Sequence, residues 1–157
     1  MDNTHQPGDK VDNYKILRKL GEGGYGTTYL AEAIDDKTQV VLKQCLSGTF
    51  EEQTTALEAL KREVDFLKSL SHRALPRMDK YIAAKTSAYM VLQYFEGQTF
   101  HEVMEERKRK PGWDVDETHW NDVLNWSLQM TEVLDFLHTQ KPMPVVHKDI
   151  KADNVML

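Results

Sequence analysis

The sequence is poor in the features that build disulfide frameworks, structural zinc sites and membrane spans. Its 157 residues include one cysteine, Cys45, which excludes an intrachain disulfide and leaves no thiolate cluster for zinc. No apolar stretch approaches the roughly 20 residues that span a bilayer, and the polar first ten residues lack the apolar run of a secretory signal. The formal net charge of −5 argues against a general binder of nucleic acid or anionic membranes. We therefore expect a cytoplasmic protein with no nucleic-acid partner and no direct membrane contact from this segment.

The hydrophobic pattern divides the chain into a β-rich first part and an α-rich second part. Alternating or β-branched runs predict strands at residues 12–20, 27–33, 39–45, 79–84 and 88–94. Apolar residues spaced three and four apart predict a helix over 54–70, and further helices are expected over 99–110 and 119–140. The expected fold class is α+β, with a polar tail at 1–11, one domain at 12–97 and a second at 98–157.

A glycine-rich segment, GEGGYG at residues 21–26, lies between the first two predicted strands. Gly21, Gly23 and Gly26 fit the G-x-G-x-x-G pattern, which dinucleotide-binding folds also carry. A dinucleotide fingerprint must open a helix, whereas TTYLAEA continues here as a strand, so a strand–loop–strand hairpin fits better. Such a loop lets backbone N–H groups approach phosphates closely, and the same residues are also compatible with a plain flexible hairpin.

Two charged residues near apolar faces are the next candidates. Lys43 ends the β-branched run VVLK, and Glu63 borders the apolar face of the predicted 54–70 helix. In one interpretation Lys43 contacts phosphate oxygens and Glu63 holds its ammonium; in the other, both are ordinary charges at the edge of a core. Because a buried ion pair is costly by itself, function explains such a pair better than stability does.

The segment HKDIKADN, residues 147–154, combines residue types that suit phosphoryl transfer. Asp149 can accept a hydroxyl proton, and Lys151 can neutralise charge on a moving phosphoryl group. Asn154 can give a neutral oxygen to Mg²⁺, which prefers oxygen ligands. Taken one at a time, the three are ordinary polar loop residues.

Taken in order, these segments resemble a eukaryotic-type protein kinase domain of the Ser/Thr branch. The resemblance lies in LGEGGYGTTY for the loop over ATP, VVLK for the lysine strand, REVDFLKSLSH for the helix with the glutamate, YMVLQYFEG for the hinge, and FLHTQKPMPVVHKDIKADNVML for the catalytic loop. It covers residues 12–157. The implied fold is a complete β-rich small lobe followed by the first part of a helical large lobe.

The resemblance implies binding of ATP and Mg²⁺ and a protein substrate with a Ser or Thr hydroxyl. Asp149 and Lys151 are the implied catalytic residues, and Asn154 is the implied metal ligand; Lys at this position goes with Ser and Thr rather than Tyr phosphorylation. Leu92 would be the gatekeeper. The implied nucleotide-binding residues are Leu20, Gly21, Glu22, Gly23, Gly24, Tyr25, Gly26, Thr28, Val41, Lys43, Glu63, Leu92, Gln93, Tyr94 and Phe95.

Several positions depart from the family pattern. Thr28 stands where Val is usual and Val41 where Ala is common. Lys148 replaces the Arg of H-R-D and cannot bond a phosphate bidentately, so control by loop phosphorylation is not implied. Ala152 stands where Pro is common.

The largest departure is that the sequence stops at Leu157, before the D-F-G Asp that should hold Mg²⁺. The first functional hypothesis is the N-terminal portion of an ATP-dependent protein serine/threonine kinase. The alternatives are a catalytically inactive truncated kinase that binds nucleotide or a partner, and the remnant of an interrupted gene. A D-F-G motif encoded downstream of the Leu157 codon would favour an interrupted or incomplete kinase.

Overall fold

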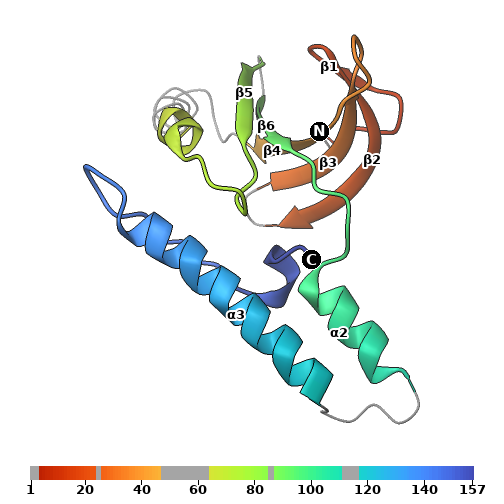
Figure 1. Cartoon of the computed structure of the whole chain (residues 1–157). Coiled ribbons are helices and arrows are strands. Elements are labelled where there is room, and N and C mark those ends of the chain that lie inside the picture. Colours follow the sequence, from red (N-terminus) through yellow and green to blue (C-terminus); the bar gives the residue numbers. More distant parts are fainter. Residues whose placement is uncertain (1–3, 24–25, 47–63, 85–86, 111–116) are drawn as a thin grey trace. The chain divides into compact units, whose positions relative to one another are not determined.

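A computed structural model describes residues 4–23, 26–46, 64–84, 87–110 and 117–157 of the chain. The chain divides into two compact units (Figure 1). The first comprises Met1–Ser71 and Pro76–Tyr94, and the second comprises His72–Leu75 and Phe95–Leu157. The short His72–Leu75 segment belongs to the second unit because its side chains contact a long helix there: Arg73 pairs with Glu132 at 2.8 Å, and the His72 ring lies 4.9 Å from that of Phe136.

The first unit is built on one antiparallel sheet with strand order β1-β2-β3-β4-β6-β5. The β-rich small lobe expected from the sequence is present as this curled antiparallel sheet. Its strands form where β-branched and aromatic residues are concentrated, as that composition favours. They are β1 (Lys10–Val11), β2 (Tyr14–Gly23), β3 (Gly26–Ala33), β4 (Gln39–Leu46), β5 (Met78–Ala83) and β6 (Ser87–Gln93).

Because residues alternate between the two sides of a strand, the register assigns every side chain to a face. The back face carries the larger core cluster of buried residues, which contains Val11, Ile16, Tyr29, Ala31, Val40, Leu42, Tyr89 and Val91. The front face carries a smaller cluster, in which Val64 of the helical residues 64–69 packs with Met78 and Met90. The rest of the predicted 54–70 helix, apart from Leu70, lies outside the described residues.

The second unit contains the helices α2 (Phe100–Lys108) and α3 (Glu117–His138) and a short 3-10 turn, η1 (Ala152–Asn154). A capping box begins α2: the Thr99 side chain accepts a hydrogen bond from the Glu102 N–H, and the Glu102 carboxylate accepts one from the Thr99 N–H. Within the described residues, no helix is both long and apolar enough to cross a membrane.

Helices α2 and α3 contact each other through an aromatic and charged cluster. The rings of Phe100 and Trp126 meet edge to face at 5.0 Å, and the Arg107 guanidinium lies 5.2 Å from the centre of the Trp126 ring. Arg107 also pairs with Asp122 at 2.7 Å. The basic end of α2 is therefore in part an internal contact, and Trp126 is a packing residue between the two helices.

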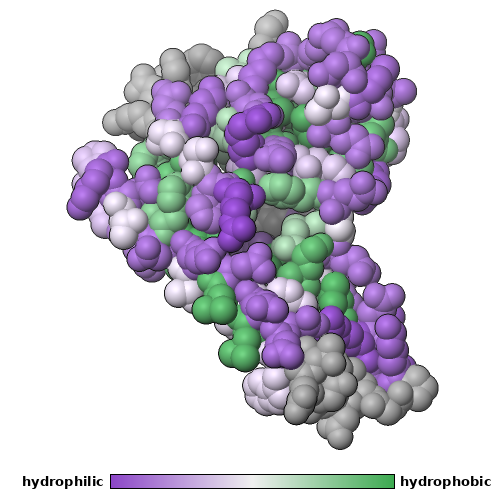
Figure 2. Space-filling model, in the orientation of Figure 1, coloured by the Kyte–Doolittle hydropathy of each residue, from purple (hydrophilic) through white to green (hydrophobic). Residues whose placement is uncertain are grey.

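The inner side of α3 differs in part from the apolar stripe that helical spacing predicts, which comprises Val123, Met130, Leu134 and Leu137. Leu137 and Val133 are buried, but Val123 and Trp120 are exposed, so packing is concentrated in the C-terminal half of the helix. Apolar surface interrupts the hydrophilic surface of this unit in Figure 2. Exposed large apolar residues in the unit include Trp120, Leu124, Leu128, Val146 and Ile150.

Candidate functional site

The glycine-rich segment forms the β2–β3 hairpin, so the strand–loop–strand prediction is confirmed. Gly21 pairs with Thr28, Glu22 with Thr27, and Gly23 with Gly26. A register shift between Lys19 and Gly21 leaves Leu20 as a bulge residue, and bulges re-aim the side chain they carry. Gly24 and Tyr25 lie outside the described residues.

The strand register gathers four predicted nucleotide-binding residues on the front face. Thr28 pairs directly with Lys43, and Val41 pairs directly with Leu92. Directly paired residues on antiparallel strands project to the same side of the sheet, so all four share one face. Lys43, Thr28, Val41 and Leu92 are each partly buried there.

Glu63 lies outside the described residues, so its contact with Lys43 stays a prediction. The next residue, Val64, is buried and packs against Met90. Met90 is also the register partner of Lys43 on the neighbouring strand. The described part of the predicted 54–70 helix therefore begins with a residue that packs against the register partner of Lys43.

The predicted hinge residues lie at the junction of the two units. Leu92 and Gln93 end β6, Tyr94 closes the first unit, and Phe95 opens the second part of the chain. The Gln93 N–H donates to the Arg77 carbonyl at 2.8 Å, and the Gln93 side-chain oxygen accepts from the Arg77 N–H at 3.4 Å. A ligand at this point would therefore not find the Gln93 N–H available, and its carbonyl is the backbone group to consider.

In the second unit, the predicted catalytic residues meet in one exposed loop. The Asn154 side-chain nitrogen donates to both the backbone carbonyl and the carboxylate Oδ2 of Asp149, each at 2.8 Å. The Lys151 ammonium lies 3.4 Å from the same Oδ2. The η1 turn produces this arrangement, because the Asn154 N–H donates to the Lys151 carbonyl at 3.0 Å and returns Asn154 toward Asp149.

The surroundings of Asp149 favour its ionised form. The hydrogen bond from Asn154 is the main cause that lowers the pKa of the Asp149 carboxyl. Burial opposes this effect, and Lys151 and His147 lower the pKa further. The carboxylate is therefore charged and able to accept a proton or a hydroxyl hydrogen bond at neutral pH. The residue before it, Lys148, adopts a left-handed backbone conformation with φ of 64°, which is uncommon for a side chain of this kind.

The segment that follows this loop is anchored to the start of α2. The Phe100 N–H donates to the Val155 carbonyl at 2.7 Å, and the Leu157 N–H donates to the Gln98 carbonyl at 2.9 Å. Gly97 makes this approach possible: its φ is +153°, and a Cβ there would lie 2.6 Å from the Leu157 carbonyl oxygen. No local pattern in the sequence indicates this contact.

Metal donors in the described part of the chain are few. No group of three or more His, Cys, Asp or Glu side chains there is arranged to hold a metal ion. Asn154 nevertheless suits a cation, because its nitrogen is engaged by Asp149 and its oxygen is the atom left to face a ligand. The residues therefore fit Mg²⁺ as a partial ligand set that phosphate oxygens and water would have to complete.

Comparisons with known proteins agree with this arrangement. A family model described as protein kinase domain matches residues 14–157. The chain is 26% identical to mouse Aurora kinase C over 147 residues, and 29% identical to the probable serine/threonine-protein kinase YbdM of Bacillus subtilis over 146 residues. The alignments cover 94% and 92% of this chain, and 49% and 52% of the relatives.

A third relative is serine/threonine-protein kinase PknA of Nostoc, which is 29% identical over 154 residues and is covered over 25% of its own length. The chain thus spans about half, or less, of the length of these curated relatives. The sheet, the glycine hairpin and the Asp149 loop define the class, and the chain belongs to the protein kinase family.

Sequence reasoning missed a set of polar residues on the back face of the sheet. Tyr29, Gln44, Ser87 and Tyr89 are buried there and hydrogen-bonded, and His5 joins them from the N-terminal tail. The only signal in the sequence is that Gln44 lies two residues after the apolar Leu42, and therefore on the same face of the predicted strand. Contacts that join residues up to 84 positions apart carry no local signature.

Proposed function

We propose that this chain is the N-terminal portion of an ATP-dependent protein serine/threonine kinase, which transfers the γ-phosphoryl group of ATP to a Ser or Thr hydroxyl of a protein. The observation that carries the proposal is the Asp149 loop, in which the Asn154 side-chain nitrogen donates to the Asp149 carboxylate and carbonyl. In this arrangement the Asn154 oxygen would be the atom that faces a cation. The register of the front face supports it, because Thr28, Val41, Lys43 and Leu92 share one side of the sheet.

The small-lobe residues would bind and orient the nucleotide. Backbone N–H groups of the glycine hairpin would cover the phosphates, and Lys43 would contact the α- and β-phosphate oxygens with Glu63 as its partner. The adenine would lie against Leu20, Thr28 and Val41, with Leu92 at the back of the pocket. The backbone of Gln93, Tyr94 and Phe95 would present the polar groups that recognise its edge.

The loop residues would carry out the transfer. The Asp149 carboxylate would accept the proton of the substrate hydroxyl as its oxygen forms a bond to the γ-phosphorus. The bond between the γ-phosphorus and the bridging oxygen breaks, and ADP leaves with the electron pair. Lys151 would neutralise charge on the phosphoryl group during the transfer, and its ammonium, 3.4 Å from the Asp149 carboxylate, would lie beside the reacting hydroxyl.

Mg²⁺, when bound, neutralises the phosphate charge of the nucleotide. Asn154 would supply one protein oxygen to it. The front-face residues alone, which group Thr28, Val41, Lys43 and Leu92 on one side of the sheet, also support a second candidate function. That candidate is a nucleotide-binding module that does not turn over. In both cases the lone Cys45 favours a reducing compartment such as the cytoplasm.

A titration with a fluorescent ATP analogue, with and without Mg²⁺, tests the proposal. Lys43→Met should weaken nucleotide binding about tenfold or more whether or not Mg²⁺ is present, because it removes a charge that contacts phosphate. Asn154→Ala should remove only the Mg²⁺-dependent part of the affinity. Lys68→Met, at an exposed lysine of the helical residues 64–69, is the matched control and should bind like the parent chain.

Two results would refute the proposal. One is equal affinity for the parent chain and Lys43→Met. The other is a Mg²⁺ dependence that survives Asn154→Ala unchanged. To separate the two candidate functions, incorporation of labelled phosphate into a basic protein would be measured. We expect none from the 157-residue polypeptide, and turnover that Asp149→Ala abolishes would favour the first candidate for this polypeptide as well.

A further inference from the structure

The back face of the sheet holds a chain of buried polar groups, which we call the back-face polar cluster: Tyr29, Gln44, Ser87 and Tyr89. The Tyr29 hydroxyl donates to the Gln44 side-chain oxygen at 3.3 Å, and the Gln44 side-chain nitrogen donates to the Ser87 hydroxyl at 3.2 Å. All four residues are less than 5% exposed. Buried polar groups are costly unless each finds a partner, so this cluster constrains the three strands that carry it.

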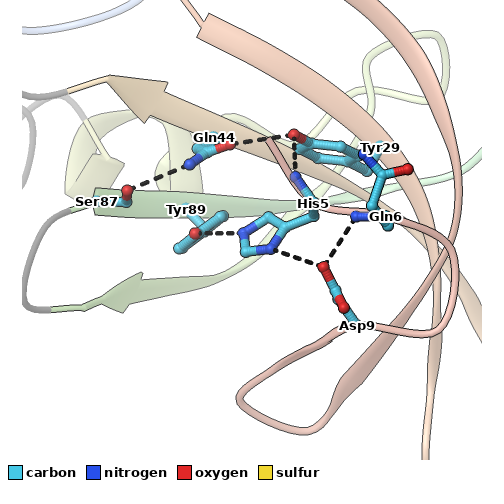
Figure 3. Close-up of polar contacts among 7 residues, drawn as sticks. All are labelled: His5, Gln6, Asp9, Tyr29, Gln44, Ser87 and Tyr89. Atoms are coloured by element: carbon cyan, nitrogen blue, oxygen red, sulfur yellow. Dashed lines mark hydrogen bonds and ion pairs between the residues drawn. The ribbon is translucent and has the colours of Figure 1, made fainter. Parts of the chain in front are cut away.

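His5, from the N-terminal tail, completes the cluster (Figure 3). Its backbone N–H donates to the Tyr29 hydroxyl at 3.1 Å, and its Nε2 lies 2.7 Å from the Tyr89 hydroxyl oxygen. Its ring also stands edge-on to that of Tyr29, at 5.5 Å between centroids. Burial raises the pKa of the Tyr89 hydroxyl, so this group keeps its proton and its capacity to donate.

A tight turn directs the tail to this position. The Asp9 N–H donates to the Gln6 carbonyl at 3.0 Å, and the Asp9 carboxylate accepts from the Gln6 N–H at 2.9 Å. Gly8 has φ of +99°, a conformation that favours glycine, and its N–H donates to the Ile16 carbonyl at 2.9 Å. The Asp9 carboxylate also lies 3.7 Å from the His5 Nδ1. The turn is thus attached to β2 at one end and to His5 at the other.

The cluster lies directly behind the front-face residues. Tyr29 follows Thr28 in β3, and Gln44 follows Lys43 in β4, so consecutive residues on these strands face opposite sides of the sheet. Thr28 and Lys43 are themselves register partners, and so are Thr27 and Gln44. Any contact that fixes Tyr29 and Gln44 therefore restricts the backbone that positions Thr28 and Lys43.

We propose that residues 4–9 form an N-terminal clasp, which docks His5 on the back-face polar cluster and thereby orders the strands that position Thr28 and Lys43. The clasp is a positioning element: His5, its anchor, contacts Tyr29 and Tyr89 on the face opposite the predicted nucleotide-binding residues. Its effect on nucleotide affinity rests on the proposed function, whereas its effect on the strands does not. Occupancy of the cluster by the tail gives the chain a means to control nucleotide binding from the opposite face.

The test compares the full chain with His5→Ala and with a chain that lacks residues 1–8. Amide hydrogen exchange of β3 and β4 is measured by NMR, and nucleotide affinity is measured with a fluorescent ATP analogue. We expect exchange at Thr28 and Lys43 to be about fivefold faster in both variants, and the affinity to fall about fivefold, at the lower end of measured couplings between sites. His101→Ala, at an exposed histidine of α2, should change neither quantity.

A peptide of residues 1–9 provides a rescue that loss of stability cannot imitate. Added to the shortened chain, it should restore slow exchange at Thr28 and Lys43, and the same peptide with His5→Ala should not. A second comparison uses Ile82→Ala, which packs against the same core cluster. Ile82→Ala should not reproduce the pattern of His5→Ala, in which amide exchange speeds up more at Thr28 and Lys43 than in the rest of the sheet. If it does reproduce this pattern, the effect is general destabilisation and the proposal is wrong.

The remaining outcomes separate the clasp from the proposed function. If amide exchange in β3 and β4 is unchanged in His5→Ala, the clasp proposal is wrong, whatever the nucleotide affinity of this variant. A second outcome is faster exchange in His5→Ala with unchanged nucleotide affinity, while Lys43→Met still abolishes binding. This outcome would overturn the proposed control of nucleotide binding by the clasp, but it would leave the kinase assignment intact. If no form of the chain binds the analogue, the proposed function fails, and the exchange and rescue data alone decide whether the clasp orders the strands.

Discussion

Replacing Gln44 by leucine should destabilise the first unit selectively. Gln44 is fully buried, and its amide joins the Tyr29 hydroxyl to the Ser87 hydroxyl. Leucine fills a similar volume but leaves the Tyr29 hydroxyl without its acceptor and removes one donor from Ser87. A buried polar group that loses its partner costs about 1–3 kcal/mol, so we expect a loss of about 2 kcal/mol in the free energy of unfolding. For a chain of this size that corresponds to a fall in Tm of about 4–8 °C.

The assay is urea unfolding followed by two probes. All three tryptophans, Trp113, Trp120 and Trp126, lie after residue 95, so their fluorescence reports on the second unit and far-UV circular dichroism reports on the sheet as well. Gln44→Leu should lower the midpoint seen by circular dichroism more than the midpoint seen by fluorescence. Gln129→Leu, at an exposed glutamine of α3, is the matched control and should shift neither by more than about 0.5 kcal/mol.

A double-mutant cycle isolates the hydrogen bond. Combining Gln44→Leu with Tyr29→Phe removes both partners, so the double variant should be about 1 kcal/mol more stable than the sum of the two single losses implies. Two results would refute the reasoning. One is a neutral Gln44→Leu, and the other is strict additivity in the cycle, which would mean that the two side chains do not interact.

Three further predictions concern the second unit. Gly97→Ala should destabilise it by about 2–4 kcal/mol, because of a strained φ and a contact of 2.6 Å with the Leu157 carbonyl oxygen; unchanged tryptophan fluorescence in urea would contradict this. Thr99→Ala removes the cap of α2 and should cost about 1 kcal/mol, with Thr99→Ser as the rescuing variant in the same assay. Because the folded pKa of Asp149 is lowered, its contribution to stability is present above the unfolded value and is lost as pH falls through the folded one. Asn154→Ala should therefore raise the pKa of Asp149 in an NMR titration and reduce this loss at acid pH.

The sequence predicted the elements that repeat a local pattern. The β2–β3 hairpin follows from glycines between two strand-like runs. The helix expected over 99–110 is present as α2, and the structure adds the capping box of Thr99 and Glu102 that begins it. Lys43 could be placed on the front face only by its register with Thr28 and Met90, which the structure supplies. The loop of Asp149 was predicted as a set of residue types, and the structure adds that Asn154 is the residue that fixes the carboxylate.

Other features could not be predicted because they depend on contacts between distant segments. Val123 has the helical spacing of an inner residue but is 39% exposed, since the packing of α3 is concentrated around Val133 and Leu137. His5 lies in a short polar tail with no periodic pattern, and its partners Tyr29 and Tyr89 are on separate strands. Burial of the Gln44 amide is likewise decided by neighbours on β3 and β6 rather than by its own strand.

The most direct measurement for the central claim is an NMR titration of the chain with ATP and Mg²⁺, observing every backbone amide. We expect the largest shift changes in two sets of residues: the hairpin from Gly21 to Thr28 together with Lys43, and the loop from Asp149 to Asn154. Both sets should move with one dissociation constant, because one nucleotide would contact both. Shift changes confined to other elements, or two sets that titrate with unrelated constants, would contradict the proposed kinase function.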